Sequence, residues 1–233
     1  MNYKEIKLSN TETYFIYQNK KVFKTFKTAL KFHEPGLASV QDETGWYHID
    51  ITGKPVYVKR YKRTFGYYFK LAAVIDQKGN WFHIDKFGNR IYKEKYAWCG
   101  NYQENLCVVR DFDGNYFHIN VKGKRIYNEN YRYAGDFKDG YASVRLANGL
   151  YKHIDYQGED LNGKLFLDLG VYHKSFATAK DERGWFHIDK LGNELYKERY
   201  TMVEPFYNSQ ALVETNKNKK IIISESGMII FKT

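Results

Sequence analysis

Residues 184–196 read GWFHIDKLGNELY, and the same skeleton returns along the whole chain. Its fixed parts are two aromatic residues, a histidine, Ile-Asp, a glycine three places after the aspartate, and a closing aliphatic residue with tyrosine. The histidines of the copies are His48, His83, His118, His153 and His187, at separations of 35, 35, 35 and 34 residues. One further step in each direction reaches Tyr14 or Ile222, where the histidine is lost but the apolar frame remains. The chain is therefore an array of seven repeats, each of which buries its apolar face on a neighbour.

Each repeat has the pattern of a short β-meander. A block whose alternate positions are apolar in every copy, such as Ala142 and Val144 or Cys107 and Val109, precedes each hairpin and predicts a strand. The spacing Asp-x-x-Gly, as in Asp189 to Gly192, is typical of a type I turn. In the fourth repeat we expect strands at 106–110, 116–119 and 125–127. In the first repeat, residues 3–8 align with the apolar block. No segment leaves room for a helix of ordinary length.

Short strands at a regular spacing predict an all-β fold with seven repeats of about 35 residues, each of three to four short antiparallel strands, in a β-propeller-like toroid. An open β-solenoid is the alternative. One observation disfavours the propeller: the two ends of the chain do not supply complementary pieces of one repeat. Another favours it, because an array that closes into a ring needs no capping segments. We expect a single domain over residues 1–233, with repeats at approximately 3–23, 24–57, 58–92, 93–127, 128–162, 163–196 and 197–233.

Two Gly-Trp pairs, Gly45-Trp46 and Gly184-Trp185, belong to the frame Asp-x-x-Gly-aromatic-aromatic-x-Ile-Asp-x-x-Gly-x-x-Ile-Tyr. This frame resembles the bacterial WG-type (KWG-type) repeats over practically the whole chain. The resemblance implies a β-propeller-like domain that serves as an interaction module, and it leaves the ligand open. Proteins with similar repeats occur alone or beside other domains, including methyltransferase-like ones. This chain departs from the pattern by placing histidine before Ile in five copies, and we expect no attached catalytic domain.

The chain is basic, with 37 Lys and Arg against 27 Asp and Glu and a net charge of +10. Because the lysines are scattered through the turns, a solvated surface is favoured over an electrostatic footprint for nucleic acid. The first residues have no apolar signal region, and no run approaches the ~18 apolar residues of a membrane span, so we expect a cytoplasmic protein without membrane contact. Cys99 and Cys107 lack CxxC spacing, which predicts reduced, buried thiols. We also expect a monomer.

Four His-x-Asp pairs, with a His-x-Asn pair in the copy at His118, are the most obvious chemical pattern. On a strand, both side chains of a pair point to the same side. A metal or catalytic site needs two or three groups that converge, whereas a pair copied once per repeat is spread over the array. We therefore expect the histidine to pack or hydrogen-bond between repeats and the aspartate to begin the turn. No cofactor, metal site or catalytic motif is predicted.

An aromatic residue stands two places before each of these histidines. This aromatic column holds Trp46, Trp81, Tyr116, Tyr151 and Trp185. Such a ladder can stack bases or sugar rings, but in a repeat protein it more often packs the repeats together.

Positions that differ from copy to copy are better candidates for binding, because packing asks for the same residue each time and a unique ligand does not. The first unequal column, two places after the leading aromatic residue of a repeat, holds Arg63, Trp98, Tyr133, Asp168 and Met202. The second unequal column, just after the apolar strand, holds Gln41, Ile75, Arg110, Arg145, Lys180 and Glu214. Nearby residues without a counterpart are Asp136, His173, Lys174 and Glu204.

These columns predict a non-catalytic binding module with a polar, aromatic-lined site for a protein segment or a small anionic ligand with a planar part. We expect its site residues to be Arg63, Trp98, Tyr133, Asp168, Arg110, Arg145, Asp136, His173, Lys174 and Glu204. One alternative is an enzyme or enzyme accessory at the mouth of the ring, with Asp168, His173, Glu204 and Arg145 as acid, base and anion-holding groups. Another is non-specific nucleic-acid binding through the basic surface.

Overall fold

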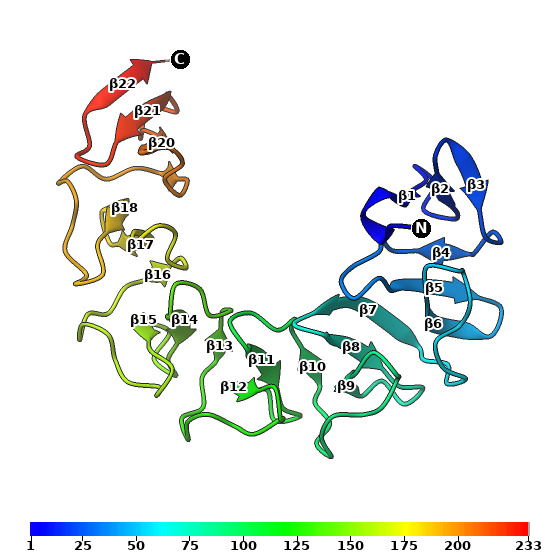
Figure 1. The fold of residues 1–233 in the computed structure, drawn as a ribbon. Coiled ribbons are helices and arrows are strands. Elements are labelled where there is room, and N and C mark those ends of the chain that lie inside the picture. Colours follow the sequence, from blue (N-terminus) through cyan, green and yellow to red (C-terminus); the bar gives the residue numbers. More distant parts are fainter. Residues whose placement is uncertain (233) are drawn as a thin grey trace. The chain divides into compact units, whose positions relative to one another are not determined.

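The computed structural model describes residues 1–232 of the 233-residue chain, and nearly all of its regular structure is β-strand. Seven antiparallel sheets follow one another along the chain, each formed by segments close in sequence (Figure 1). The one helical segment within residues 1–232 is a 3₁₀ turn, η1 (Tyr3–Glu5), capped by the Asn2 side chain. None of these residues forms a helix long and apolar enough to span a bilayer.

Strands lie in chain order within every sheet, as in a meander. The first three sheets contain β1 (Lys7–Leu8), β2 (Phe15–Tyr17), β3 (Lys20–Val22); β4 (Thr28–Ala29), β5 (Ala38–Asp42), β6 (Gly45–Ile49); β7 (Arg63–Tyr68), β8 (Leu71–Ile75) and β9 (Trp81–Ile84). The next three contain β10 (Trp98–Cys99), β11 (Leu106–Arg110), β12 (Tyr116–Asn120); β13 (Tyr133–Ala134), β14 (Ala142–Arg145), β15 (Tyr151–Ile154); β16 (Asp168–Leu169), β17 (Ala177–Asp181) and β18 (Gly184–Ile188). The seventh has four strands, β19 (Met202–Val203), β20 (Gln210–Glu214), β21 (Lys220–Ser224) and β22 (Ile229–Lys232).

The chain divides into two compact units. Unit 1 comprises Met1–Gly114 and Ile119–Lys124, and unit 2 comprises Asn115–His118 and Arg125–Thr233. Each has its own apolar core, which includes Phe15 and Tyr47 in unit 1 and Phe186 and Tyr172 in unit 2.

Two of the strands expected in the fourth repeat are β11 and β12, but the expected strand at 125–127 is wrong. That segment is a bend with a single bridge residue, because the chain turns and Tyr127 points inward to His118. Within residues 1–232, only the first and last repeats close with a true strand, β3 or β22. Of the expected strand at 3–8, only the last two residues are extended as β1, since residues 3–5 form η1.

The Asp-x-x-Gly segments form the predicted tight turns. The Gly53 amide donates to the Asp50 carbonyl at 2.9 Å, and the Asp50 carboxylate accepts from the Thr52 amide at 2.8 Å. Gly53 has a φ of +79°, a left-handed conformation in which a side chain would be strained. The aspartate therefore begins the turn and caps it.

The histidine column joins successive repeats, as expected. His83 is 1% exposed; its Nε2–H donates to the Gly100 carbonyl of the next repeat at 3.0 Å, and its Nδ1 accepts from the Tyr92 hydroxyl at 2.5 Å. Because a carbonyl can only accept, this arrangement fixes the neutral tautomer. The carbonyl bond recurs at His48, His118, His153 and His187, at 2.8 to 2.9 Å.

His153 is the exception in this column. Position 162 holds Asn where the other four copies with a histidine hold Tyr. Both His153 Nδ1 and Asn162 Nδ2 are buried without a hydrogen-bond partner among the described residues. The aliphatic part of the Lys164 side chain fills part of the space that the tyrosine ring takes in other copies. In those copies the turn glycine faces this ring, as Gly88 faces Tyr57, whereas a Cβ on Gly192 would lie 2.8 Å from both Lys164 and Asn162.

Candidate functional site

The two unequal columns meet in the structure, because their residues are cross-strand partners in one row of each sheet. The pairs are Arg63 with Ile75, Trp98 with Arg110, Tyr133 with Arg145, Asp168 with Lys180, and Met202 with Glu214. The next strand adds a residue of the aromatic column, for example Trp81 opposite Ile75 and Trp185 opposite Lys180. We call this set of cross-strand neighbours the terminal row, because it lies at the end of each sheet next to the hairpin turn that joins its second and third strands.

Most side chains of the terminal row are neither buried nor free in solvent. Arg63, Trp81 and Trp98 are half-buried in unit 1, and Tyr133 is 44% exposed in unit 2. Trp46 differs, because it is buried at 3% exposure. The fold therefore leaves one row of mixed aromatic and charged residues accessible on its sheets.

In unit 1 the terminal rows join into a stack of flat groups. The Arg63 guanidinium lies 3.9 Å from the centre of the Trp46 ring and 5.7 Å from that of Phe65. Phe65 stacks on Trp81 with ring centres 5.1 Å apart and an interplanar angle of 18°, and Trp98 follows at 6.4 Å from Trp81. These five residues are the unit 1 stack. Contacts of this kind stabilise by about 0.5–1.5 kcal/mol each beyond the area that they bury.

Phe65 reaches this stack because β7 is irregular. β7 has six residues where β4, β10, β13, β16 and β19 have two, and its register with β8 shifts between Thr64 and Tyr67. Phe65 and Gly66 fall in this shift, which bends the strand as a β-bulge does. Three other copies hold glycine where Phe65 stands, namely Gly100, Gly135 and Gly170.

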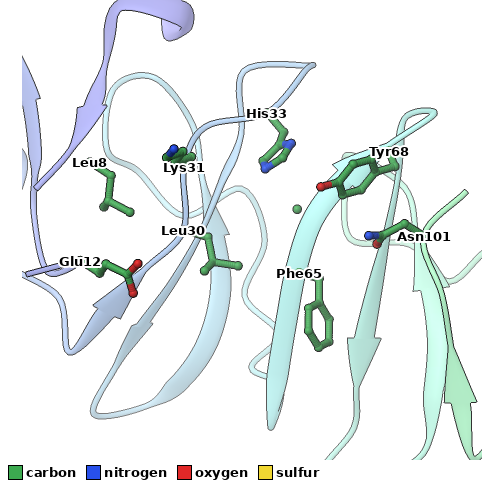
Figure 2. Close-up of a pocket in the computed structure, with 9 residues that line it drawn as sticks. Leu8, Glu12, Leu30, Lys31, His33, Phe65, Tyr68 and Asn101 are labelled. Carbon is green, nitrogen blue, oxygen red and sulfur yellow. The ribbon is translucent and has the colours of Figure 1, made fainter. Parts of the chain in front are cut away.

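A cavity of about 330 Å³ opens beside the bulge (Figure 2). We call it the unit 1 cavity, and its lining residues are Leu8, Glu12, Leu30, Lys31, His33, Phe65, Gly66, Tyr68 and Asn101. Figure 2 shows Leu8 and Glu12 on one side and Tyr68 and Asn101 on the other. Phe65 belongs to both the stack and the cavity, so the two adjoin at this residue.

Charged groups of both signs surround this cavity. Neither the Glu12 carboxylate nor the Lys31 ammonium forms an ion pair or a side-chain hydrogen bond with a described residue. Burial lowers the pKa of Arg63, and the nearby Glu12 carboxylate opposes this effect. Burial, assisted by Lys31, also lowers the pKa of His33, so its ring is neutral at pH 7.

The position of His33 depends on Gly66. The two imidazole atoms nearest to Gly66 would lie 2.8 Å from a Cβ there, which is closer than real contacts allow. The ring centre of His33 is 5.2 Å from that of Tyr68. The bulge glycine thus makes room for an imidazole at the mouth of the cavity.

Unit 2 gathers three of the predicted residues. The Tyr133 ring lies 5.8 Å from Tyr116 and 6.5 Å from Tyr151. Burial raises the pKa of Tyr133, and the carboxylates of Asp136 and Asp168 raise it further. The pKa of Asp136 is itself raised by the surrounding protein, although its side chain is exposed.

The remaining predicted residues are more dispersed. The Lys138 ammonium donates to His173 Nδ1 at 3.1 Å, while the His173 ring packs 4.9 Å from Tyr207 and its Nε2 is buried without a partner. Lys174 and Glu204 are exposed, and the Glu204 carbonyl is the acceptor for His187. No hydrogen bond or ion pair among the described residues joins any two of Asp168, His173, Glu204 and Arg145.

Sequence reasoning missed the unit 1 cavity. Leu30 and Phe65 stand at a position that is glycine in three other copies, and His33 and Tyr68 belong to a further unequal column with Gln103, Lys138, His173 and Tyr207. A comparison of the copies that included these two further columns would have identified the four residues.

Residues 1–232 contain no group of three or more His, Cys, Asp or Glu that could hold a metal ion. Cys99 and Cys107 are buried thiols, as expected, and Cys107 Sγ packs 3.8 Å from His83 Nε2.

No protein-family model matches the sequence, and no curated protein matches it either. Solved structures are similar in fold. The computationally designed protein Ika8 matches with a TM-score of 0.53 and 10% identity, over 98% of this chain and 85% of the other. BamB from Moraxella catarrhalis matches with a TM-score of 0.53 and 13% identity, over 95% of this chain and 76% of the other. Hsv2p from Kluyveromyces lactis matches with a TM-score of 0.50 and 10% identity, over 93% of this chain and 88% of the other.

These likenesses concern the fold alone. BamB and Hsv2p are β-propeller proteins, and each repeat of this chain forms its own antiparallel sheet. A β-solenoid would instead run continuous sheets through successive repeats. The chain therefore has a fold of the β-propeller class, as the repeat pattern predicts.

Proposed function

We propose that this chain is a non-catalytic binding module of the WG-repeat type, and that the unit 1 stack and the unit 1 cavity hold a segment of another protein. The observation that carries the proposal is the terminal row. Residues that vary from repeat to repeat lie beside one another, half-exposed, whereas the residues that repeat are buried in the core or form turns.

The stack has the composition of a recognition surface. Aromatic residues and arginine are enriched at binding hot spots, because they offer a large contact area at a small loss of conformational freedom. Trp81, Trp98 and Arg63 present such area beside a cavity whose walls include Leu30 and Phe65. An apolar side chain of a partner would fill the cavity while neighbouring residues lie along the stack.

The charges favour a peptide over a small anion at this place. Glu12 would repel a purely anionic ligand, whereas Glu12 and Lys31 together complement a segment that carries both signs. The resemblance to WG-type repeats, which implies an interaction module, supports the same function.

A test is to select 12-residue peptides from a random display library on the purified protein and measure their dissociation constants. We expect Trp98→Ala with Arg110→Ala, and separately Phe65→Gly, to weaken the selected peptides by about tenfold or more. Phe65→Gly is the gentlest choice, since Gly100, Gly135 and Gly170 occupy the equivalent positions. The melting temperature of each variant should fall by about 2–6 °C, the loss expected when one stack contact is removed at a half-buried position.

The control is Phe87→Ala, which removes an aromatic ring that is 64% exposed in a turn outside the row. Its peptide affinity should equal that of the wild type. The proposal is wrong if no peptide is enriched, or if the stack variants bind the selected peptides as tightly as the Phe87 variant does. A large loss of stability in Trp98→Ala with Arg110→Ala would show instead that these residues belong to the core.

A further inference from the structure

A second cavity, of about 340 Å³, lies in unit 2 at the hairpin turn between β17 and β18. Lys180, Arg183 and Trp185 line it from the sixth sheet, and Thr201 and Asn216 from the seventh. Two antiparallel bonds between Trp185 and Tyr200, at 2.8 and 3.0 Å, hold the two sheets together at this point. The cavity is thus built on regular backbone pairing.

One cation of this cavity is uncommitted. The Lys180 ammonium lies 5.7 Å from the centre of the Trp185 ring and makes no ion pair with a described residue. Arg199 differs, since its side chain is 6% exposed and its guanidinium lies 2.8 Å from Asp181 and 3.1 Å from Glu194. The scaffold therefore satisfies Arg199 and leaves Lys180 available.

The turn at Asp42 to Gly45 in the second repeat is the equivalent of the turn at Asp181 to Gly184, so the two can be compared. A Cβ on Gly45 would lie 3.0 Å from the Tyr61 carbonyl oxygen, and one on Gly184 would lie 2.7 Å from that of Tyr200. In both turns the first aspartate accepts a bond of 2.9 Å from the amide two residues later. The two turns therefore share one backbone conformation.

The side chains around the two turns differ where they face the cavity. Gln41 and Thr44 occupy the places of Lys180 and Arg183. Glu182 also lines the cavity, but the earlier turn has Glu43 at the same place, so the acidic residue is common to both. The sixth repeat therefore adds two cations, Lys180 and Arg183. The Arg183 guanidinium lies 3.2 Å from Asp181 and 3.9 Å from Glu194, but its side chain stays 62% exposed, and the same turn forms in the second repeat with Thr44 in its place.

We propose that the cavity at Lys180 is a binding site for a small anion that carries a planar ring. The anionic group would lie against the Lys180 ammonium, the Arg183 guanidinium and the Asn216 amide, all of which donate hydrogen bonds. The ring would pack on Trp185, because aromatic stacking tolerates different ring systems. The volume falls within the range of about 300–1,000 Å³ that is usual for small-molecule sites.

This site is independent of the peptide surface of unit 1. It shares no residue with the unit 1 stack or the unit 1 cavity. Failure of one proposal leaves the other intact.

The test measures binding of defined probes to the full chain by titration calorimetry. Adenosine monophosphate and 4-hydroxybenzoate represent phosphorylated and carboxylated ring anions, and adenosine and inorganic phosphate each lack one half of the proposed ligand. We expect at least one of the two ring anions to bind about tenfold more tightly than adenosine and inorganic phosphate. Which of the two binds better identifies the anionic group.

The deciding variant is Lys180→Gln with Arg183→Thr, which gives the sixth turn the side chains of the second. It should weaken the better probe by about tenfold or more, because two charge-assisted contacts are lost, and it should retain the melting temperature. Lys190→Met is the matched control, since its ammonium also lies over a ring, 5.3 Å from Tyr141, but outside the cavity. Equal affinity of the double variant and the control, or no preference for the ring anions over adenosine and phosphate, would overturn the proposal.

Discussion

The buried histidines make stability depend on pH. Burial lowers the pKa of His48, His83, His118, His153 and His187 to about 4, whereas an imidazole in an unfolded chain ionises near ~6.5. Between these values the unfolded chain binds protons that the folded chain does not, so stability falls as the pH is lowered from about 6.5 to 4. Each histidine contributes up to about 1.4 kcal/mol per pH unit. Urea unfolding at pH 7, 6 and 5 should show this loss, and equal free energies at pH 7 and 5 would contradict it.

The tyrosine partner of each histidine is a second test at this scale. Tyr92→Phe removes the hydroxyl that donates to His83 Nδ1 and leaves a buried acceptor unpaired. We expect the free energy of unfolding to fall by about 1–3 kcal/mol, as measured by urea denaturation. Tyr207→Phe is the control, because Tyr207 is 62% exposed and should tolerate the change. The pair of His153 and Asn162 shows that the array tolerates one such loss, so a second loss should weaken the protein without abolishing folding.

At the scale of the element, turn glycines serve two separate purposes. Gly79 and Gly88 both have left-handed backbone, with φ of +87° and +80°. A Cβ on Gly79 would meet nothing within 4 Å, whereas one on Gly88 would overlap the Tyr57 ring. Gly79→Ala should therefore destabilise only by backbone strain, about 1 kcal/mol, and Gly88→Ala by a further 1–3 kcal/mol, roughly, from overpacking. Equal melting temperatures for the two variants would show that the ring moves aside.

The regular parts of these elements could be predicted because each repeats one local pattern. Residues 106–110 belong to the block whose alternate positions are apolar in every copy, and they form β11. The Asp-x-x-Gly spacing forms the turns. The closing segment could not be read in the same way, because Tyr127 turns inward to bind the side chain of His118 in the preceding strand, and a strand pattern does not show this side-chain hydrogen bond. The bulge at Phe65 and Gly66 was also invisible, since a register shift depends on both paired strands.

The candidate site was predicted in part for a similar reason. Comparison of copies identified both unequal columns, but only the antiparallel register shows that Trp98 stands opposite Arg110 and Tyr133 opposite Arg145. His173 and Glu204 were grouped because they are near in sequence to other candidates, and the fold gives them separate partners. Proximity along a repeat is a weaker guide than position in the sheet row.

At the scale of the whole molecule, repetition separates stability from recognition. Equivalent buried positions carry the same residue types, so every repeat is packed by the same set of contacts. The terminal rows are released from that constraint, so neighbouring sheets can present Trp98, Tyr133 or Asp168 at the same place. A chain built in this way can acquire a site in one repeat while the others keep the scaffold.

The net charge of +10 gives the last prediction. Several cations are already engaged within the scaffold: the Arg60 guanidinium lies 3.9 Å from the Tyr47 ring centre, and Lys24 pairs with Asp42 at 2.8 Å. Such groups would have to leave their partners to neutralise phosphates. Binding to double-stranded DNA should therefore be weak, and the slope of log K against log salt should be no steeper than about −3, which corresponds to roughly three phosphate contacts. Fluorescence anisotropy with a labelled duplex between 25 and 200 mM salt, roughly, measures this slope. A value near −6 or steeper would reveal an assembled phosphate track and favour nucleic acid as the partner.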